Sequence, residues 1–187
     1  MFRFRLLGLA LATVLAAVPT SIHAQATGAM SDADYMAKIT ASAPLGVVKG
    51  ATIVQMNADG TMRTLQKGTN GFTCMMVDSG TPGCADANAI AWMHALMTHA
   101  APPQTVGFMY MLGGDAGASN TEPLATGPTA TNHWVKTGPH VMILGPSVAT
   151  MGYPATLDPD PTKPYVMWPN TPYAHLMIPV TVTPTSP

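Results

Sequence analysis

Two short segments of this sequence repeat one pattern of metal-binding side chains. His140 lies two residues before Met142, and His175 lies two residues before Met177. In a strand, residues two apart point to the same face, so each segment would present an imidazole beside a thioether. Soft sulfur favours Cu(I) and imidazole nitrogen also suits Cu(II). If the two strands are neighbours, the sequence therefore predicts a copper site formed by His140, Met142, His175 and Met177.

The alternative interpretation of these residues is structural. The chain contains 15 methionines, and flexible thioethers fill irregular hydrophobic cores well. Both histidines would then be hydrogen-bonded strand residues and both methionines would be core residues. The sequence indicates no other cofactor.

A second hypothesis is a module that binds a small molecule or a carbohydrate. Trp134, Trp168 and Tyr173 lie in or beside predicted loops of the C-terminal half, with proline and asparagine nearby. Exposed aromatic rings in such loops can stack on a sugar or another small ligand. Ser119 and Asn120, in a long polar segment, would add hydrogen bonds to that ligand.

A third hypothesis is a small secreted hydrolase. Ser119 would be the nucleophile, with His140 or His175 as the base. Asp115 or Glu122 would orient that base. The sequence lacks the G-x-S-x-G and H-E-x-x-H motifs and a phosphate-binding loop with a following lysine. It therefore leaves open whether the protein is an enzyme.

The helices and strands that position these residues are predicted from the spacing of apolar residues and from capping and turn residues. Asp86 is a good N-cap for a helix, and Asp59-Gly60 is typical of a hairpin turn. The segment Gly113–Gly138 has no convincing period, and long loops of this kind often carry function. Helices are expected over 33–42 and 87–99, and strands over 51–57, 61–67, 105–112, 140–144, 165–168 and 175–182.

Helices and strands do not alternate strictly in this order. The expected fold is therefore α+β, a single domain with a mostly antiparallel sheet of about five or six strands, two or three short helices and long loops. Only 9% of the 187 residues are charged and the net charge is −1, which argues against a nucleic-acid partner. The sequence does not fix the oligomeric state.

The N-terminus has the pattern of a secretory signal peptide over residues 1–26. Arg3 and Arg5 precede the apolar run Leu6–Val18. The small residues Ala24 and Ala26 then form an A-x-A cleavage site. The globular domain is then expected over residues 27–187, in the periplasm or outside the cell. No membrane association is expected after cleavage.

Export makes the two cysteines informative. Cys74 and Cys84 enclose nine residues that include two glycines and a proline suited to a turn. In an oxidising compartment two cysteines this close are expected to form a disulfide. The absence of C-x-x-C spacing argues against redox or zinc chemistry.

Several stretches of the chain resemble an uncharacterised family of exported bacterial proteins. The segments that carry the resemblance are 67–74 (KGTNGFTC), 110–114 (YMLGG), 119–121 (SNT), 134–136 (WVK), 138–142 (GPHVM), 166–168 (VMW) and 171–180 (TPYAHLMIPV). The resemblance implies export, a single domain, and a shared structural role for the two H-x-M segments and for residues 119–121. It implies no reaction, substrate or cofactor.

Overall fold

A computed structural model describes residues 30–78 and 80–181 of the chain. The predicted signal peptide, residues 1–26, lies outside the described residues. The described helices are α1 (Asp32–Thr40), α2 (Leu45–Gly50), α3 (Ala87–Met97) and the short 3₁₀ helix η1 (Pro146–Thr150). The described strands are β1 (Thr52–Met56), β2 (Met62–Gln66), β3 (Phe72–Met76), β4 (Pro82–Asp86), β5 (Gly107–Met111), β6 (Ala118–Ser119), β7 (Trp134–Val135), β8 (His140–Leu144), β9 (Tyr165–Met167) and β10 (His175–Pro179).

Eight of these strands form one sheet in the order β2-β1-β3-β4-β5-β8-β10-β9. Within it β1 and β3 run parallel, and the other neighbouring pairs are antiparallel. The predicted α+β class and the mostly antiparallel sheet are confirmed. The predicted five or six strands were too few, because β3 and β4 form a hairpin whose glycine and proline content is untypical of strands.

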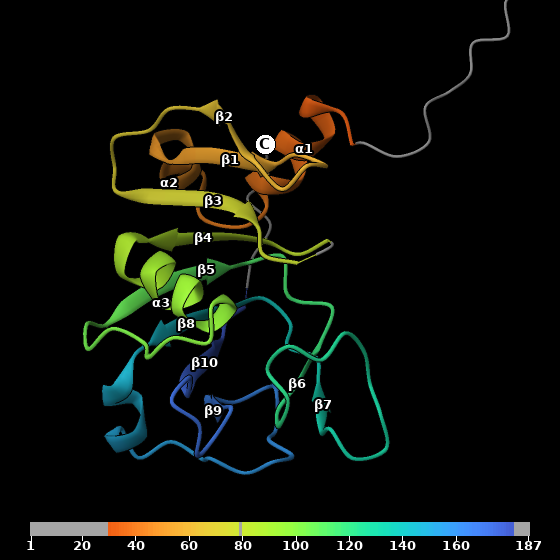
Figure 1. Cartoon of the computed structure of the whole chain (residues 1–187), viewed down its shortest axis with the longest axis vertical. Coiled ribbons are helices and arrows are strands. Elements are labelled where there is room, and N and C mark those ends of the chain that lie inside the picture. The colour runs from red at the N-terminus through yellow and green to blue at the C-terminus, as the bar shows by residue number, and fades with distance from the viewer. Residues whose placement is uncertain (1–29, 79, 182–187) are drawn as a thin grey trace, which may run out of the picture.

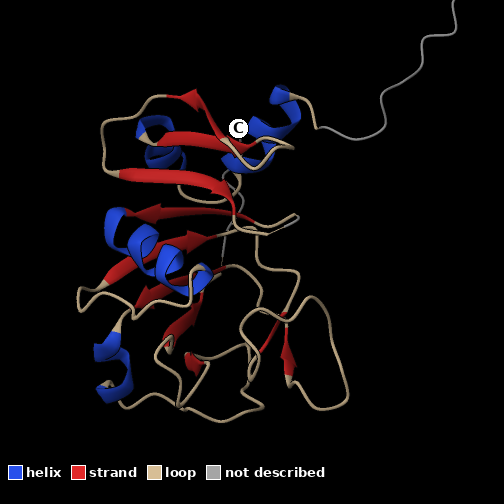
Figure 2. Cartoon of the chain, in the orientation of Figure 1, coloured by secondary structure: helices blue, strands red, loops and turns tan. Residues whose placement is uncertain are grey.

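Helices cover both faces of this sheet, as Figures 1 and 2 show, with α3 in front and α2 behind. One buried cluster joins α3 to β5, β8, β9 and β10 on the front face. A second cluster packs α1 and α2 against the disulfide and β1. A third lies under η1 and includes Val148, Val166 and Leu176. The predicted H-x-M segments therefore belong to the centre of the structure.

Acidic and hydroxyl side chains begin the two longer helices. Ser31 caps α1 by accepting the N–H of Asp34, and Asp86 caps α3 by accepting the N–H of Ala89 at 2.8 Å. The second carboxylate oxygen of Asp86 accepts the N–H of Phe108 in β5 at 3.1 Å. One residue thus starts α3 and fixes that helix against the sheet.

The predicted disulfide is present and joins β3 to β4. Cys74 and Cys84 are directly opposite each other in the antiparallel ladder, with an S–S distance of 2.00 Å. Both cysteines are fully buried under α1 and α2.

Within the two described stretches, no helix is both long enough and apolar enough to span a bilayer.

Removal of the disulfide should destabilise the protein without changing the fold. The bond closes a loop with a sequence separation of 10, and the entropy of that closure corresponds to about 3 kcal/mol of unfolding free energy. Cys74→Ala combined with Cys84→Ala is expected to lose about this amount in denaturant unfolding. Reduction of the native protein serves as the control and should give a similar loss. A double variant as stable as the oxidised protein would contradict the assignment.

Candidate functional site

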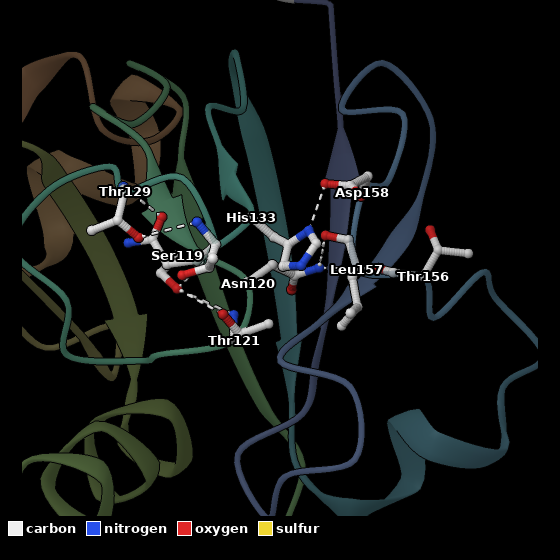
Figure 3. Close-up of polar contacts among 10 residues, drawn as sticks. Ser119, Asn120, Thr121, Thr129, His133, Thr156, Leu157 and Asp158 are labelled. Carbon is white, nitrogen blue, oxygen red and sulfur yellow. Dashed lines mark hydrogen bonds and ion pairs between the residues drawn. The ribbon is translucent and has the colours of Figure 1, made fainter.

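Asn120 fixes the long Gly113–Gly138 segment to two other loops. It is 1% exposed, and its side-chain amide donates to the carbonyls of Thr156 and Leu157 at 3.0 and 2.8 Å, as Figure 3 shows. Its Oδ1 accepts the backbone N–H of Trp168 at 2.8 Å. Because buried amides are costly to leave unpaired, these bonds determine where the segment lies.

Trp168 completes this junction from the other side. Its indole N–H donates to the carbonyl of Ser119 at 2.7 Å, and its ring stacks on Trp92 of α3 with centroids 6.0 Å apart. Its backbone φ is +55°, a left-handed conformation that is unfavourable for a bulky side chain. The surrounding contacts hold it there. We call Ser119, Asn120 and Trp168 with their hydrogen bonds the Asn120 junction.

Ser119 turns the chain toward the end of α3. Its hydroxyl donates to the carbonyl of Asn132 at 2.7 Å and accepts the N–H groups of Thr121 and Glu122 at 3.2 and 2.8 Å. No histidine is among the hydrogen-bond partners of this hydroxyl in the part of the chain that the structure describes. The residue predicted as a nucleophile therefore has a structural set of bonds.

A further contact joins the same two loops. His133 Nδ1 lies 2.8 Å from Asp158 Oδ1, next to the bonds from Asn120 to Thr156 and Leu157 (Figure 3). The Gly113–Gly138 segment is thus attached to the loop of residues 151–164 at two points.

A cavity of about 490 Å³ opens beside the Asn120 junction. Three segments of the chain supply its walls: the end of α3, the turn that Ser119 initiates, and the loop before β10. The lining residues are Leu96, His99, Glu122, Pro123, Leu124, Ala125, Thr171, Pro172 and Tyr173. Most of these side chains are apolar, while His99 and Glu122 carry groups that can be charged. The volume lies within the range of small-molecule sites, and the hollow is widely open to solvent.

Tyr173 is held in position in the cavity wall. Its hydroxyl donates to the carbonyl of Ala100 at 2.8 Å, and its ring meets Trp92 edge to face with centroids 6.0 Å apart. His99, which precedes Ala100 and also lines the cavity, has a backbone φ of +54°. Left-handed residues are costly and tend to gather at functional sites.

The other residues predicted to bind a ligand lie elsewhere. Trp168 is 7% exposed, and Ser119 and Asn120 are 1% exposed, so all three lie beneath the surface and support the cavity. Trp134 is half-buried against Gly117, where a Cβ would come within 2.1 Å of its indole nitrogen. Tyr173 is the predicted residue that lines the cavity.

The two H-x-M segments are neighbouring strands, as the copper hypothesis requires. Met142 and Met177 are directly opposite each other in the antiparallel pair of β8 and β10. His140 is opposite Pro179, and His175 is opposite Leu144. The two histidines are therefore four residues apart along the strands, about 13 Å. They share one face of the sheet but lie at opposite ends of the methionine pair.

His175 is enclosed by aromatic rings. Its ring centroid lies 4.8 Å from that of Trp168 and 5.3 Å from that of Trp92, both edge to face. Its Nδ1 is 3.1 Å from the carbonyl of Tyr173. Burial lowers the pKa of His175 to about 4, against a smaller opposing effect of that hydrogen bond. His175 is thus a neutral packing residue.

Among the described residues, no cluster of three or more histidine, cysteine, aspartate or glutamate side chains is arranged to hold a metal ion. That finding does not address thioether ligands. The copper site predicted from His140, Met142, His175 and Met177 stays a prediction, with the register now known.

Comparisons of the chain with models of protein families, with curated proteins and with solved structures find no match. The resemblance to a family of exported proteins therefore stays a prediction.

The sequence did not predict that these separate segments line one cavity. Leu96 and His99 come from the end of a helix, and Pro123 to Ala125 come from a segment without periodicity. The walls meet only because the Asn120 junction brings distant loops together. Glu122, considered earlier as an orienting acid, is the one wall residue besides Tyr173 that the sequence had indicated.

Asn120→Asp should strongly destabilise the protein. The change removes the amide donor and places a negative charge beside the carbonyls of Thr156 and Leu157, so we expect a loss of about 3 kcal/mol or more in denaturant unfolding. Asn88→Asp is the matched control, because the Asn88 amide donates to the carbonyl of Val106 at 2.9 Å from an exposed position. It should cost less than about 1 kcal/mol. Equal losses in the two variants would contradict the role of the junction.

The burial of His175 should make stability depend on pH. Its pKa is about 4 in the folded protein and about 6.5 when unfolded. The stabilisation is therefore complete above about pH 6.5 and is lost as the pH falls toward 4, by roughly 3 kcal/mol. His175→Phe keeps the aromatic contacts and should lack this part of the acid sensitivity. Parallel stability curves for the two proteins between pH 7 and 4 would show that His175 is not buried as a neutral group.

Proposed function

We propose that this protein is an exported binding protein for a small organic cation with an apolar body. The observation that carries the proposal is the 490 Å³ cavity, whose mostly apolar lining also includes Tyr173 and the exposed residue Glu122. Export is supported by the predicted signal peptide and by the disulfide between Cys74 and Cys84.

The charge of the wall favours a cation. Glu122 is the only glutamate of the chain, and it takes part in none of the ion pairs among the described residues. A carboxylate beside apolar surface interacts favourably with an ammonium group, and a hydrogen bond to a charged group is stronger than a neutral one. The tyrosine ring adds attraction for a cation through its negative face.

The cavity is also formed in advance of any ligand. Ser119 fixes the turn at Glu122 through a 2.8 Å hydrogen bond, and Ala100 fixes the hydroxyl of Tyr173. A site whose walls are already ordered does not lose that conformational entropy on binding. A small ligand can therefore bind with useful affinity from a limited contact area.

Binding of three probes with the same ring tests the proposal. Isothermal titration with 2-phenylethylamine, 2-phenylethanol and phenylacetate compares a cation, a neutral molecule and an anion. We expect the amine to bind about five- to tenfold more tightly than the alcohol, and the acid to bind least. Glu122→Gln should remove the preference for the amine, since it keeps the shape of the side chain and loses the charge.

Asp34→Asn is the matched control for charge. Asp34 is an exposed carboxylate of α1 outside the cavity lining, so this variant should keep the preference for the amine. Tyr173→Leu should weaken binding of the amine and of the alcohol, because both probes contact the ring. Tightest binding of phenylacetate, or no saturable binding of any probe, would refute the proposed ligand class.

A further inference from the structure

A fully buried nitrogen without a partner lies at the end of β8. His140 is 0% exposed, and its Nδ1 lies 2.7 Å from the carbonyl of Gly138. A carbonyl only accepts, so Nδ1 carries the proton and Nε2 presents a lone pair. No hydrogen-bond donor reaches Nε2 among the described residues. Buried polar atoms are rarely left this way, so the lone pair needs an explanation.

Methionine side chains lie next to His140 on the same face of the sheet. Met111 of β5 is directly opposite His140, and Met142 follows His140 by two residues on β8. Side chains in these two relations point to one face and are the nearest neighbours available in a sheet. Met111 is 5% exposed and Met142 is 8% exposed. Both belong to the cluster beneath α3 and the Gly113–Gly138 segment.

Two further methionines extend the row across the sheet. Met109 and Met177 are directly opposite Met142 on its two sides. Met109 turns its methyl group over Gly83 of β4, where a Cβ would come within 2.2 Å of it. Met109 therefore packs against the neighbouring strand, and Met177 is a diagonal neighbour of His140.

We propose that His140, Met111 and Met142 bind one Cu(I) ion on the inner face of β5 and β8. Thioethers are soft ligands that favour Cu(I) over harder divalent ions, and imidazole also binds copper.

The charge around the site fits a monovalent ion. All three ligands are neutral, so the bound ion would bring one positive charge into the protein interior. The Asp115 carboxylate lies close enough to act electrostatically on His140, and it is held there by the N–H groups of Gly117 and Thr137 at 2.9 Å. A nearby negative charge offsets the cost of burying a cation.

This ligand set differs from the one that the sequence predicts. His175 is packed between Trp92 and Trp168 at the other end of the strand pair, so it is replaced here by Met111 of the neighbouring strand. The site is separate from the ligand cavity, whose lining includes none of these three residues. Failure of one proposal therefore does not affect the other.

Anaerobic competition with the Cu(I)–bicinchoninate complex tests the site. The purified protein should remove one ion per chain from the coloured complex. His140→Asn keeps a donor for the carbonyl of Gly138 and lacks Nε2, so it should bind at least about tenfold more weakly. Met111→Leu combined with Met142→Leu preserves core volume and should also lose binding. Met167→Leu, a buried methionine of β9 opposite His175, should bind normally.

A second measurement locates the ion. With ¹³C-labelled methionine methyl groups, addition of Ag(I) as a redox-inert substitute should shift the signals of Met111 and Met142 but not that of Met167. Circular dichroism checks folding, and if His140→Asn does not fold, the double methionine variant decides. The proposal is overturned if no ion is removed from the complex, if either folded ligand variant binds as well as the native protein, or if Zn²⁺ binds at the same residues with equal affinity.

Discussion

Asn120 uses its buried amide to join three loops that are far apart in the sequence. Its Nδ2 bonds to Thr156 and Leu157 and its Oδ1 to Trp168, while Ser119 beside it accepts the indole N–H of Trp168. Each of these groups would be costly to bury unpaired. The position of the Gly113–Gly138 segment, and with it one wall of the cavity, depends on this set of bonds.

Backbone strain accumulates where these loops meet the cavity. His99, Trp168 and Asn170 all have positive φ values, between 54° and 62°. Conformations of this kind persist only where the surroundings enforce them. For Trp168 the enforcing contacts are the stack on Trp92 and the hydrogen bonds of the junction. They hold Trp168 in place next to residues 171–173, which line the cavity.

Much of the fold is predictable from local patterns, whereas the sites depend on register. The capped helix α3, strand β8 and the disulfide follow from periodicity, capping and cysteine spacing. Strands β3 and β4 do not, since β4 begins with proline and glycine and the turn before it contains another glycine. The copper hypothesis required the two H-x-M strands to be neighbours, and they are. Their register, which separates His140 from His175 and brings Met111 to His140, cannot be read from one sequence.

Native-state hydrogen exchange of Trp168 tests most directly whether the Asn120 junction holds the cavity wall in place. Its backbone N–H and its indole N–H are the two donors that Trp168 contributes to the junction. If the junction is part of the cooperative structure, both protons should exchange only through openings nearly as costly as global unfolding, like the amides of β8. Exchange of both protons through a low-energy local opening, while β8 stays protected, would contradict the account.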